Sequence, residues 1–263
     1  MTKKVHIDPN DVYQYQLKSL QAGDVAFTLD IPSNPTKTFE NAKIALNFKK
    51  QFEDQGIKLY AVITLDSSLN PEVARKFAKK INKLDFDGIA IGALTKLCSR
   101  LWQIGLIIAS VKSVTTKPIH VMGVSGYDLM YLLAWLDIDS FDSNKHLKGA
   151  KYREYHLITG SLAYVGNHHA YRRRFVRNGF TPCFCPACLQ MKKLEKFQES
   201  DAKVVAYLAA HNFFVMMQHL RLITLAKDEG WFERLLQERM LRSSRLRKAI
   251  EILSRTSLVS RGI

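Results

Sequence analysis

The stretch LYAVITLDSSLNPEVARKFAKKINKLDFDGIAIGAL, residues 59–94, decides the fold class of this chain. It begins and ends with a short apolar run bounded by Asp or Gly, which is typical of a strand buried on both faces. Between the two runs, a proline near the start and lysine near the end predict a helix over 70–85. Strand, helix and strand at this spacing indicate a βαβ unit and a parallel sheet.

The same alternation continues on both sides of this stretch. Further apolar runs predict strands at 24–32 and 118–124, and the short segment SFDS at 140–143 gives a fifth. Weaker strand candidates lie at 4–7 and at 154–166, and the second of these divides into two strands with a turn at its glycine. The sequence therefore predicts an α/β fold, although a (β/α)8 barrel needs eight strands.

Helical patterns fill the remaining sequence. The segment 41–56 ends at a glycine suited to a C-cap, and the segment 125–138 follows the fourth predicted strand. After about residue 190 the strand signals stop, and we expect helices to the end of the chain. A basic stretch at 239–255 has helical character.

Composition indicates a globular, intracellular protein. The chain has 263 residues, of which 47% are hydrophobic and 24% charged. Its first residues, MTKKVHIDPND, lack the apolar core of a secretion signal, and its longest apolar run, 104–111, is far shorter than the roughly 20 residues that cross a bilayer. We expect a cytoplasmic location without membrane association, where cysteines stay reduced and clustered cysteines more often bind metals.

The charge favours an anionic partner. Lys and Arg number 39 against 24 Asp and Glu, so the formal net charge is +15. The segment HHAYRRRFVRNG at 168–179 combines aromatic side chains with a cluster of cations that could contact phosphates: Arg172, Arg173, Arg174 and Arg177. Nucleic-acid binding is the favoured interpretation, and a solvated basic face is the alternative.

Three of the four cysteines lie within TPCFCPACLQ, residues 181–190. The spacing Cys183-x-Cys185-x2-Cys188, followed by His211, supplies three thiolates and one imidazole. That set completes the tetrahedral coordination of Zn²⁺ and leaves no position for water, so the metal would be structural. His219 is the main rival ligand. The cysteines could also be a chance cluster of free thiols, and His211 could be a histidine packed within a helix.

Carboxylates and glycines follow the predicted strands. Asp30 and Asp142 come after the first and fifth strands, and Gly92 and Gly123 come after the third and fourth. In a parallel α/β barrel the active site is built from the loops at the carboxyl ends of the strands. Each aspartate could instead be a helix N-cap. Two carboxylates with glycines between them favour a binding site.

Taken in order, these segments resemble the tRNA-guanine transglycosylase family. FDGIAIGAL, the segment from KPIHVMGV to SFDS, and DPNDVYQYQLKSLQAGDVAFTLDIPSNP are similar to conserved segments of that family, and Cys-x-Cys-x2-Cys with a later His-Asn is similar to its zinc site. The similarity extends from residue 8 to about 235. It implies a TIM-type (β/α)8 barrel and the exchange of guanine in a nucleic acid for a 7-deazaguanine of the preQ0 type.

The resemblance also implies residue roles. Asp142 matches the catalytic nucleophile, and Asp30 matches the catalytic carboxylate that reads the guanine edge. Gly92 and Ala93 match the loop that contacts the base, and Gly123 lies in the Met-Gly-Val turn. The zinc ligands by position are Cys183, Cys185, Cys188 and His211.

Several features depart from the family pattern. The Thr-Asp-Ser-Gly-Gly segment that holds a further aspartate has no match, so we expect a barrel shortened at its N-terminus or completed by a partner subunit, and a homodimer is also open. SNKHLKG follows Asp142 in place of Leu-Pro-Thr-Arg, and the tRNA-binding PUA domain of archaeal members has no match. These departures favour the DNA-modifying, DpdA-like branch. DNA is therefore the first expected substrate, tRNA is the alternative, and a non-catalytic zinc-containing subunit is a third interpretation.

We expect two parts in the chain. Residues 1–178 would form the catalytic part of the barrel. Residues 179–263 would form a zinc-binding subdomain and C-terminal helices packed on the barrel.

Overall fold

The structure is a computed structural model that describes residues 7–66, 68–123, 126–164, 183–191, 202–256 and 258. The chain divides into two compact units, each described here by itself. The first, which we call the sheet unit, consists of Met1–Val124, Leu132–Asp142 and Ser243–Ile263. The second, which we call the cysteine unit, consists of Ser125–Tyr131 and Ser143–Arg242.

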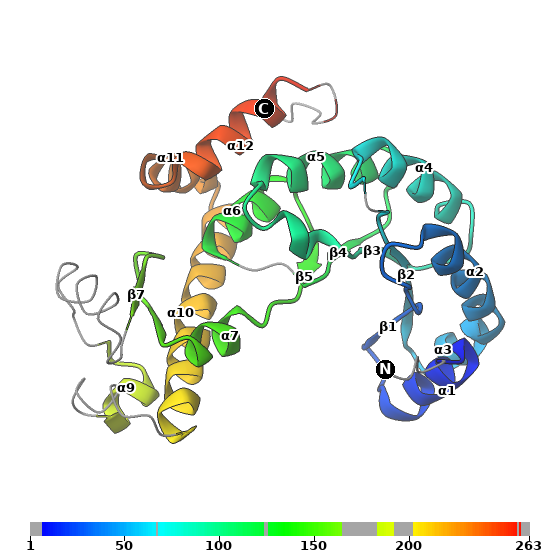
Figure 1. Cartoon of the computed structure of the whole chain (residues 1–263), viewed down its shortest axis with the longest axis horizontal. Coiled ribbons are helices and arrows are strands. Elements are labelled where there is room, and N and C mark those ends of the chain that lie inside the picture. The colour runs from blue at the N-terminus through cyan, green and yellow to red at the C-terminus, as the bar shows by residue number, and fades with distance from the viewer. Residues whose placement is uncertain are drawn as a thin grey trace, which may run out of the picture. The chain divides into compact units, whose positions relative to one another are not determined.

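The sheet unit contains a curled parallel sheet of five strands in the order β1-β2-β3-β4-β5 (Figure 1). All five predicted strands are confirmed. Their bounds are β1 Val25–Phe27, β2 Lys58–Ile63, β3 Gly88–Ile91, β4 Ile119–Val121 and β5 Ser140–Phe141. The sheet is the strand layer of a (β/α)8-type barrel, of which the described residues contain five strands.

Burial on both faces explains the continuous apolar runs. Every residue of β3 is buried, as are all residues of β2 after Lys58. The register pairs Tyr60 with Gly88 and Ile63 with Ile91, so that β2 and β3 end together. This alignment brings the loops that follow the strands to one edge of the sheet.

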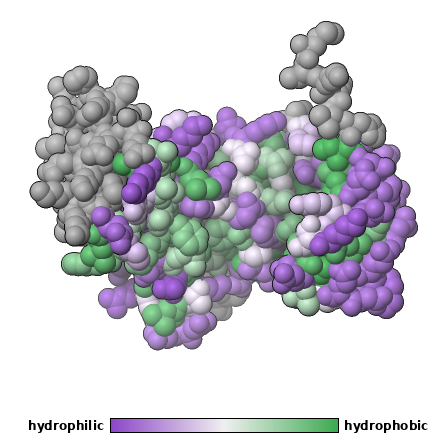
Figure 2. Space-filling view, turned by 90° about the horizontal axis from the view of Figure 1, so that it is seen from below, coloured by the Kyte–Doolittle hydropathy of each residue, from purple (hydrophilic) through white to green (hydrophobic). Residues whose placement is uncertain are grey.

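Helices cover the outer side of this sheet (Figure 1). Their bounds are α1 Pro9–Ser19, α2 Pro35–Ala45, α3 Lys49–Asp54, α4 Pro71–Ile81, α5 Leu101–Lys112 and α12 Ser244–Ser254, with short 3-10 turns η1 Leu46–Phe48 and η2 Leu94–Leu97. On the face drawn in Figure 2, hydrophilic side chains gather over the helices near the N-terminus. Helix α6, Tyr127–Trp135, begins in the cysteine unit and ends in the sheet unit.

Two predicted helices differ from the observed ones in their bounds. The helix predicted over 70–85 begins where expected, because the Asn70 side chain accepts the backbone N–H of Glu72 and a proline occupies the first position, but it ends at Ile81. The segment 41–56 is divided by η1 into the end of α2 and all of α3. It does finish at Gly56, whose φ is 71°.

Helix α12 packs against α5 within the sheet unit. A methyl group added at Gly105 on α5 would lie 2.4 Å from Cδ1 of Leu253, so the absence of a side chain allows the two helices to approach. The basic stretch 239–255 is not one helix, because the Ser243 side chain accepts the backbone N–H of Leu246 and starts α12 as a separate element.

The cysteine unit is built around the long helix α10. Its elements are the first turn of α6, α7 Lys145–Lys151, β6 Glu154–His156, β7 Leu162–Tyr164, α9 Pro186–Met191, α10 Ala202–Asp228 and α11 Phe232–Arg242. The two strands predicted within 154–166 are confirmed, with Gly160 at φ 75° in the turn. They form an antiparallel pair of their own and are not strands of the barrel sheet.

Several predictions fall partly outside the described residues. The strand candidate at 4–7 lies there except for Ile7, which is not in a strand. The expected boundary after residue 178 also lies outside the described residues. The division into 1–178 and 179–263 therefore stays a prediction, and the two observed units have other bounds. Within the described residues, no helix combines the length and the apolar character that crossing a membrane requires.

Candidate active site and metal centre

The predicted strand-end residues all follow strands of one parallel sheet, inside the sheet unit. Gly92 and Asp142 come directly after β3 and β5, whereas Asp30 and Gly123 come three and two residues after β1 and β4. Gly92 lies beside Asp30, since a methyl group added to this glycine would be 3.8 Å from Oδ2 of the aspartate. The carboxyl edge of the sheet therefore carries both carboxylates.

Asp142 is held from the neighbouring strand. Its backbone N–H donates to the carbonyl of Val121 at 3.3 Å, which continues the pairing of β5 with β4. Its Oδ1 accepts the backbone N–H of Gly123 at 2.9 Å and lies 3.3 Å from Nε2 of His120. The Asp142 side chain remains 57% exposed, so the carboxylate is oriented by protein contacts and still open to a reactant.

Asp30 has a different environment. Burial raises the pKa of its carboxyl group, and a hydrogen bond from its own backbone N–H partly offsets this effect. A half-buried carboxylate facing a backbone segment that lacks a side chain suits the recognition of a planar ring carrying N–H donors. The neighbouring residue Ala93 adopts a left-handed backbone, with φ 62°, at the start of η2.

The four predicted metal ligands are brought together in the cysteine unit. The ligand atoms of Cys183, Cys185, Cys188 and His211 all lie within 4.8 Å of one another. Nδ1 of His211 is 3.2 Å from Sγ of Cys183 and 3.4 Å from each of the other two sulfurs. Three thiols and one imidazole in this arrangement can hold a metal ion, with Zn²⁺ favoured by the ligand types.

Contacts around the ligands fit a metal. Nε2–H of His211 donates to the carbonyl of His156 at 2.8 Å, which fixes the tautomer and leaves the Nδ1 lone pair directed at the sulfurs. The backbone N–H groups of Cys185 and Cys188 point to the sulfurs of Cys183 and Cys185 at 3.5 and 3.3 Å. Such donors stabilise negative charge on sulfur, as a metal–thiolate centre requires.

The thiols interact strongly with one another. A hydrogen bond between the sulfurs of Cys183 and Cys188, 3.4 Å apart, lowers the pKa of Cys183 to about 3, and burial raises the pKa of Cys185. Three adjacent thiolates repel each other, and a divalent cation offsets that repulsion. Tyr155 closes one side of the group, because its ring stacks on His211 with centroids 3.7 Å apart.

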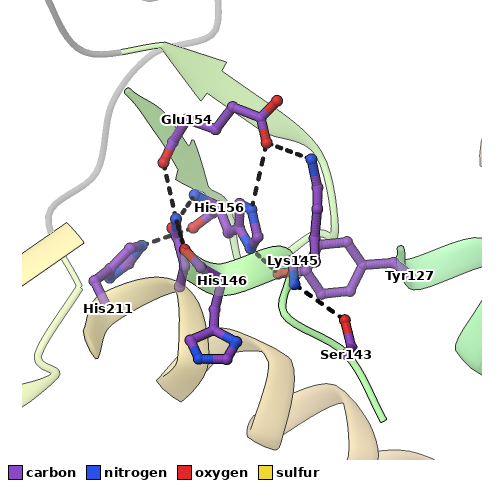
Figure 3. Close-up of polar contacts among 8 residues, drawn as sticks. Tyr127, Ser143, Lys145, His146, Glu154, His156 and His211 are labelled. Carbon is purple, nitrogen blue, oxygen red and sulfur yellow. Dashed lines mark hydrogen bonds and ion pairs between the residues drawn. The ribbon is translucent and has the colours of Figure 1, made fainter. Parts of the chain in front are cut away.

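Behind the metal ligands lies a polar network that the sequence analysis did not find (Figure 3). Glu154 forms an ion pair with Lys145, and its Oε2 lies 3.9 Å from Nε2 of His156. The other ring nitrogen of His156 bonds the hydroxyl of Tyr127 at 2.8 Å. The proximity of His156 and the ion pair with Lys145 lower the pKa of Glu154, and burial lowers the pKa of His156. Glu154 is therefore an ionised acceptor beside a neutral imidazole.

Asn212, the residue after the ligand His211, connects this network to α10. Its Oδ1 accepts the backbone N–H of His156 at 3.0 Å, and its Nδ2–H donates to the carbonyl of Glu154 at 2.9 Å. The side chain is fully buried. Two adjacent residues of α10 thus hold β6: His211 through its hydrogen bond to the carbonyl of His156, and Asn212 through its side-chain amide.

The rival ligand His219 is not part of the metal group. Its Nδ1 lies 3.3 Å from the hydroxyl of Tyr131, and burial is the main cause that lowers its pKa to about 4. The group of side chains that could hold a metal ion thus contains His211 and not His219. The predicted phosphate contacts Arg172, Arg173, Arg174 and Arg177 lie outside the described residues.

Comparison with known proteins identifies the family. The family model for queuine tRNA-ribosyltransferase matches residues 2–245, which is nearly the whole chain. The chain belongs to the queuine tRNA-ribosyltransferase family. The resemblance stated from the sequence motifs is therefore confirmed at the level of the superfamily, and the DpdA-like branch within it stays a prediction.

Curated relatives include archaeal enzymes named tRNA-guanine(15) transglycosylase. The protein from Methanococcus maripaludis strain C6 is 28% identical over 263 residues, covering 95% of this chain and 39% of the relative. Those from Methanocaldococcus jannaschii and Thermococcus onnurineus are each 28% identical, covering 95% and 82% of this chain. The chain spans less than two fifths of the length of these family members.

The sequence analysis missed two residues near Asp142, of which His120 contacts the carboxylate and Ser140 contacts His120. His120 and Ser140 are paired across β4 and β5 and lie next to the carboxylate. A signal for His120 was present, because a histidine interrupts an otherwise apolar strand between Ile119 and Val121. Which residue it would face depends on the register between two strands, which one strand's sequence does not specify.

Proposed function

We propose that this chain is the catalytic part of a guanine transglycosylase that exchanges guanine in tRNA for a 7-deazaguanine base. The observation that supports this most directly is the pair of carboxylates, Asp30 and Asp142, at the carboxyl edge of one parallel sheet. Membership in the family, and the tRNA named in its relatives' descriptions, support tRNA as the substrate. DNA was the first substrate expected from the sequence, but the names of these relatives refer to tRNA. We therefore include DNA as a second substrate in the test.

In the proposed mechanism Asp142 attacks the anomeric carbon of the target nucleotide. A bond forms between Oδ2 and this carbon while the bond to guanine breaks, and the electron pair leaves with the base, which takes up a proton. The incoming base then loses its own proton and attacks the same carbon, which returns Asp142 to the carboxylate. Two displacements retain the configuration at the sugar, and the proton gained in the first step balances the one lost in the second.

Asp30 would select the base. Its carboxylate accepts hydrogen bonds from the ring N–H and the exocyclic amine of guanine, and adenine would leave these acceptors unpaired. The backbone beside it, at Gly92 and Ala93, offers a surface on which a flat ring can lie against the chain. A target base must leave its stack to reach this edge, as in other enzymes that modify bases.

The four-ligand group would hold one structural Zn²⁺. Bound zinc would cross-link α9 and the loop before it to α10, because Cys188 and His211 lie on these two helices. The set is closed, so we assign no catalytic water to it. Nucleic-acid contacts by the four arginines of 172–177, a cytoplasmic location and assembly as a homodimer or with a partner subunit stay predictions.

The test is the exchange of carbon-14-labelled guanine into an unmodified tRNA transcript and, separately, into duplex DNA. We expect label in tRNA, its loss in Asp142→Asn, and strongly reduced incorporation in Asp30→Asn. The exposed Asp85→Asn variant is the matched control and should behave as wild type. Label in DNA and none in tRNA would identify DNA as the substrate. Full activity of Asp142→Asn would overturn the mechanism.

A further inference from the structure

We infer that His120 is a positioning residue for Asp142, and that Ser140 sets the tautomer in which it acts. The inference deepens the proposed function and rests on it, because it requires Asp142 to be the attacking carboxylate. It starts from the strand register, which places His120 of β4 opposite Ser140 of β5, two residues before Asp142.

The two ring nitrogens of His120 have different partners. Nδ1 lies 2.9 Å from Oγ of Ser140, and Nε2 lies 3.3 Å from Oδ1 of Asp142. When the Ser140 hydroxyl donates to Nδ1, a neutral imidazole carries its proton on Nε2 and donates to Asp142. The serine thus makes the histidine a hydrogen-bond donor to the carboxylate.

The imidazole ring is itself fixed. Only 14% of the His120 side chain is exposed, and its ring lies 5.1 Å from the ring of Phe27, centroid to centroid. Phe27 is the last residue of β1, so the contact holds the imidazole against the inside of the curled sheet. A donor held by a strand on one side and an aromatic ring on another keeps its direction.

Both donors to Asp142 reach the same oxygen. Oδ1 accepts from the backbone of Gly123 at 2.9 Å and from His120, whereas no donor among the described residues contacts Oδ2. Gly123, whose N–H donates to the carboxylate, has a φ of 65°, a conformation that residues with side chains adopt rarely. The carboxylate is therefore fixed through Oδ1, and Oδ2 is the oxygen left to attack.

This arrangement serves both half-reactions. In the first, the orientation of Oδ2 toward the anomeric carbon raises the fraction of bound complexes that can react. In the second, Asp142 leaves as a carboxylate, and the two donors stabilise the charge that develops on it. Because His120 contacts neither the sheet edge beside Asp30 nor the base-reading backbone, base binding should not depend on it.

Two polar substitutions separate positioning from packing. In His120→Gln the amide nitrogen reaches the place of Nε2 and keeps a donor to Asp142, whereas the shorter Asn of His120→Asn reaches only toward Ser140. We expect kcat for guanine exchange into tRNA to fall about 10- to 100-fold in His120→Asn with KM unchanged, and to stay within about 5-fold of wild type in His120→Gln. The kcat of Ser140→Ala should lie between those of His120→Asn and His120→Gln.

The covalent protein–tRNA adduct, quantified on a denaturing gel in single-turnover reactions, gives the decisive readout. Slower adduct formation in His120→Asn than in His120→Gln, with equal thermal stability, is the expected result. Equal rates for these two variants, in a protein whose wild type forms the adduct and whose Asp142→Asn does not, would overturn the role of His120 and leave the proposed function standing. Absence of any adduct in wild type with either tRNA or DNA would overturn both.

Discussion

Arg239 and Asp128 stand 111 residues apart in the chain, and their side chains form an ion pair within the cysteine unit. Nη2 and Nε of the arginine donate to the same carboxylate oxygen at 2.7 and 3.0 Å. The arginine also donates to the carbonyl of Thr159 at 2.9 Å, in the turn between β6 and β7. Both side chains are about nine-tenths buried, so this pair joins α11, the start of α6 and the hairpin away from water.

Removal of one partner should therefore be costly. In Arg239→Ala the Asp128 carboxylate stays buried without its cation, and we expect the free energy of unfolding to fall by about 3 kcal/mol. Urea denaturation followed by circular dichroism measures this. Arg234→Ala is the matched control, because Arg234 pairs with Glu238 at 3.6 Å on an exposed face and should change stability by less than about 1 kcal/mol. Equal losses in the two variants would contradict the assignment of a buried pair.

The metal site predicts a dependence of stability on zinc. We expect elemental analysis to find one Zn²⁺ per chain. The melting temperature should fall after chelation, because bound zinc would link α9 to α10 and its removal breaks that link. Cys185→Ala should lose the metal. Cys98, a free cysteine in the sheet unit, supplies the control Cys98→Ala, which should retain full zinc content. Unchanged melting after complete removal of zinc would show that the group does not stabilise the fold.

Asn212 should matter through its amide. In Asn212→Leu the backbone N–H of His156 and the carbonyl of Glu154 lose a buried partner, and we expect a loss of about 2–3 kcal/mol. Zinc affinity should fall as well, since the His156 carbonyl that orients His211 would be less well held. Phe213→Ala, at the next and half-exposed position, is the control for an altered α10 surface. A variant as stable as wild type would show that water replaces the amide.

Asp30 should make stability depend on pH in a defined direction. Burial raises the pKa of this carboxyl above its unfolded value, so the folded state favours the protonated form. Its favourable contribution is complete below the unfolded pKa of about 3.9 and is lost as pH rises through the raised folded pKa. Asp30→Asn should therefore be more stable relative to wild type at about pH 8 than at about pH 4.5, in thermal melts at both. Asp85→Asn controls for charge, and a difference between variant and wild type that is constant with pH would refute the effect.

The sequence was sufficient for the sheet, because β2 and β3 are continuous apolar runs with a helical pattern between them, whereas the longer apolar run at 104–111 lies in α5. It was insufficient for the hairpin at 154–166, because the sequence predicts two strands there but does not specify that they pair with each other and not with the barrel sheet. The separation of α11 from α12 at Ser243 was also missed. The residues on both sides of Ser243 have a basic helical pattern, which predicted one continuous helix although serine is a favoured N-cap residue.

The candidate site divides in the same way. The metal ligands were predictable because three cysteines close together in the sequence, with a histidine behind them, have few other uses. The contacts of Asp142 were not predictable, because they depend on how β4 and β5 align and on the direction of an imidazole. The Glu154–Lys145–His156 network was not predictable for the same reason, because it depends on how α7, which carries Lys145, packs on β6, which carries Glu154 and His156.

The sheet unit has a consequence for the order in which the protein is made. Its core includes α12, which packs on α5 although 147 residues lie between Gly105 and Leu253, and the whole cysteine unit occupies that interval. During synthesis, the face of α5 that contacts α12 would stay exposed until Leu253 has left the ribosome. Contacts formed across so long an interval are slow to close, so α12 covers α5 only after the cysteine unit has been synthesised.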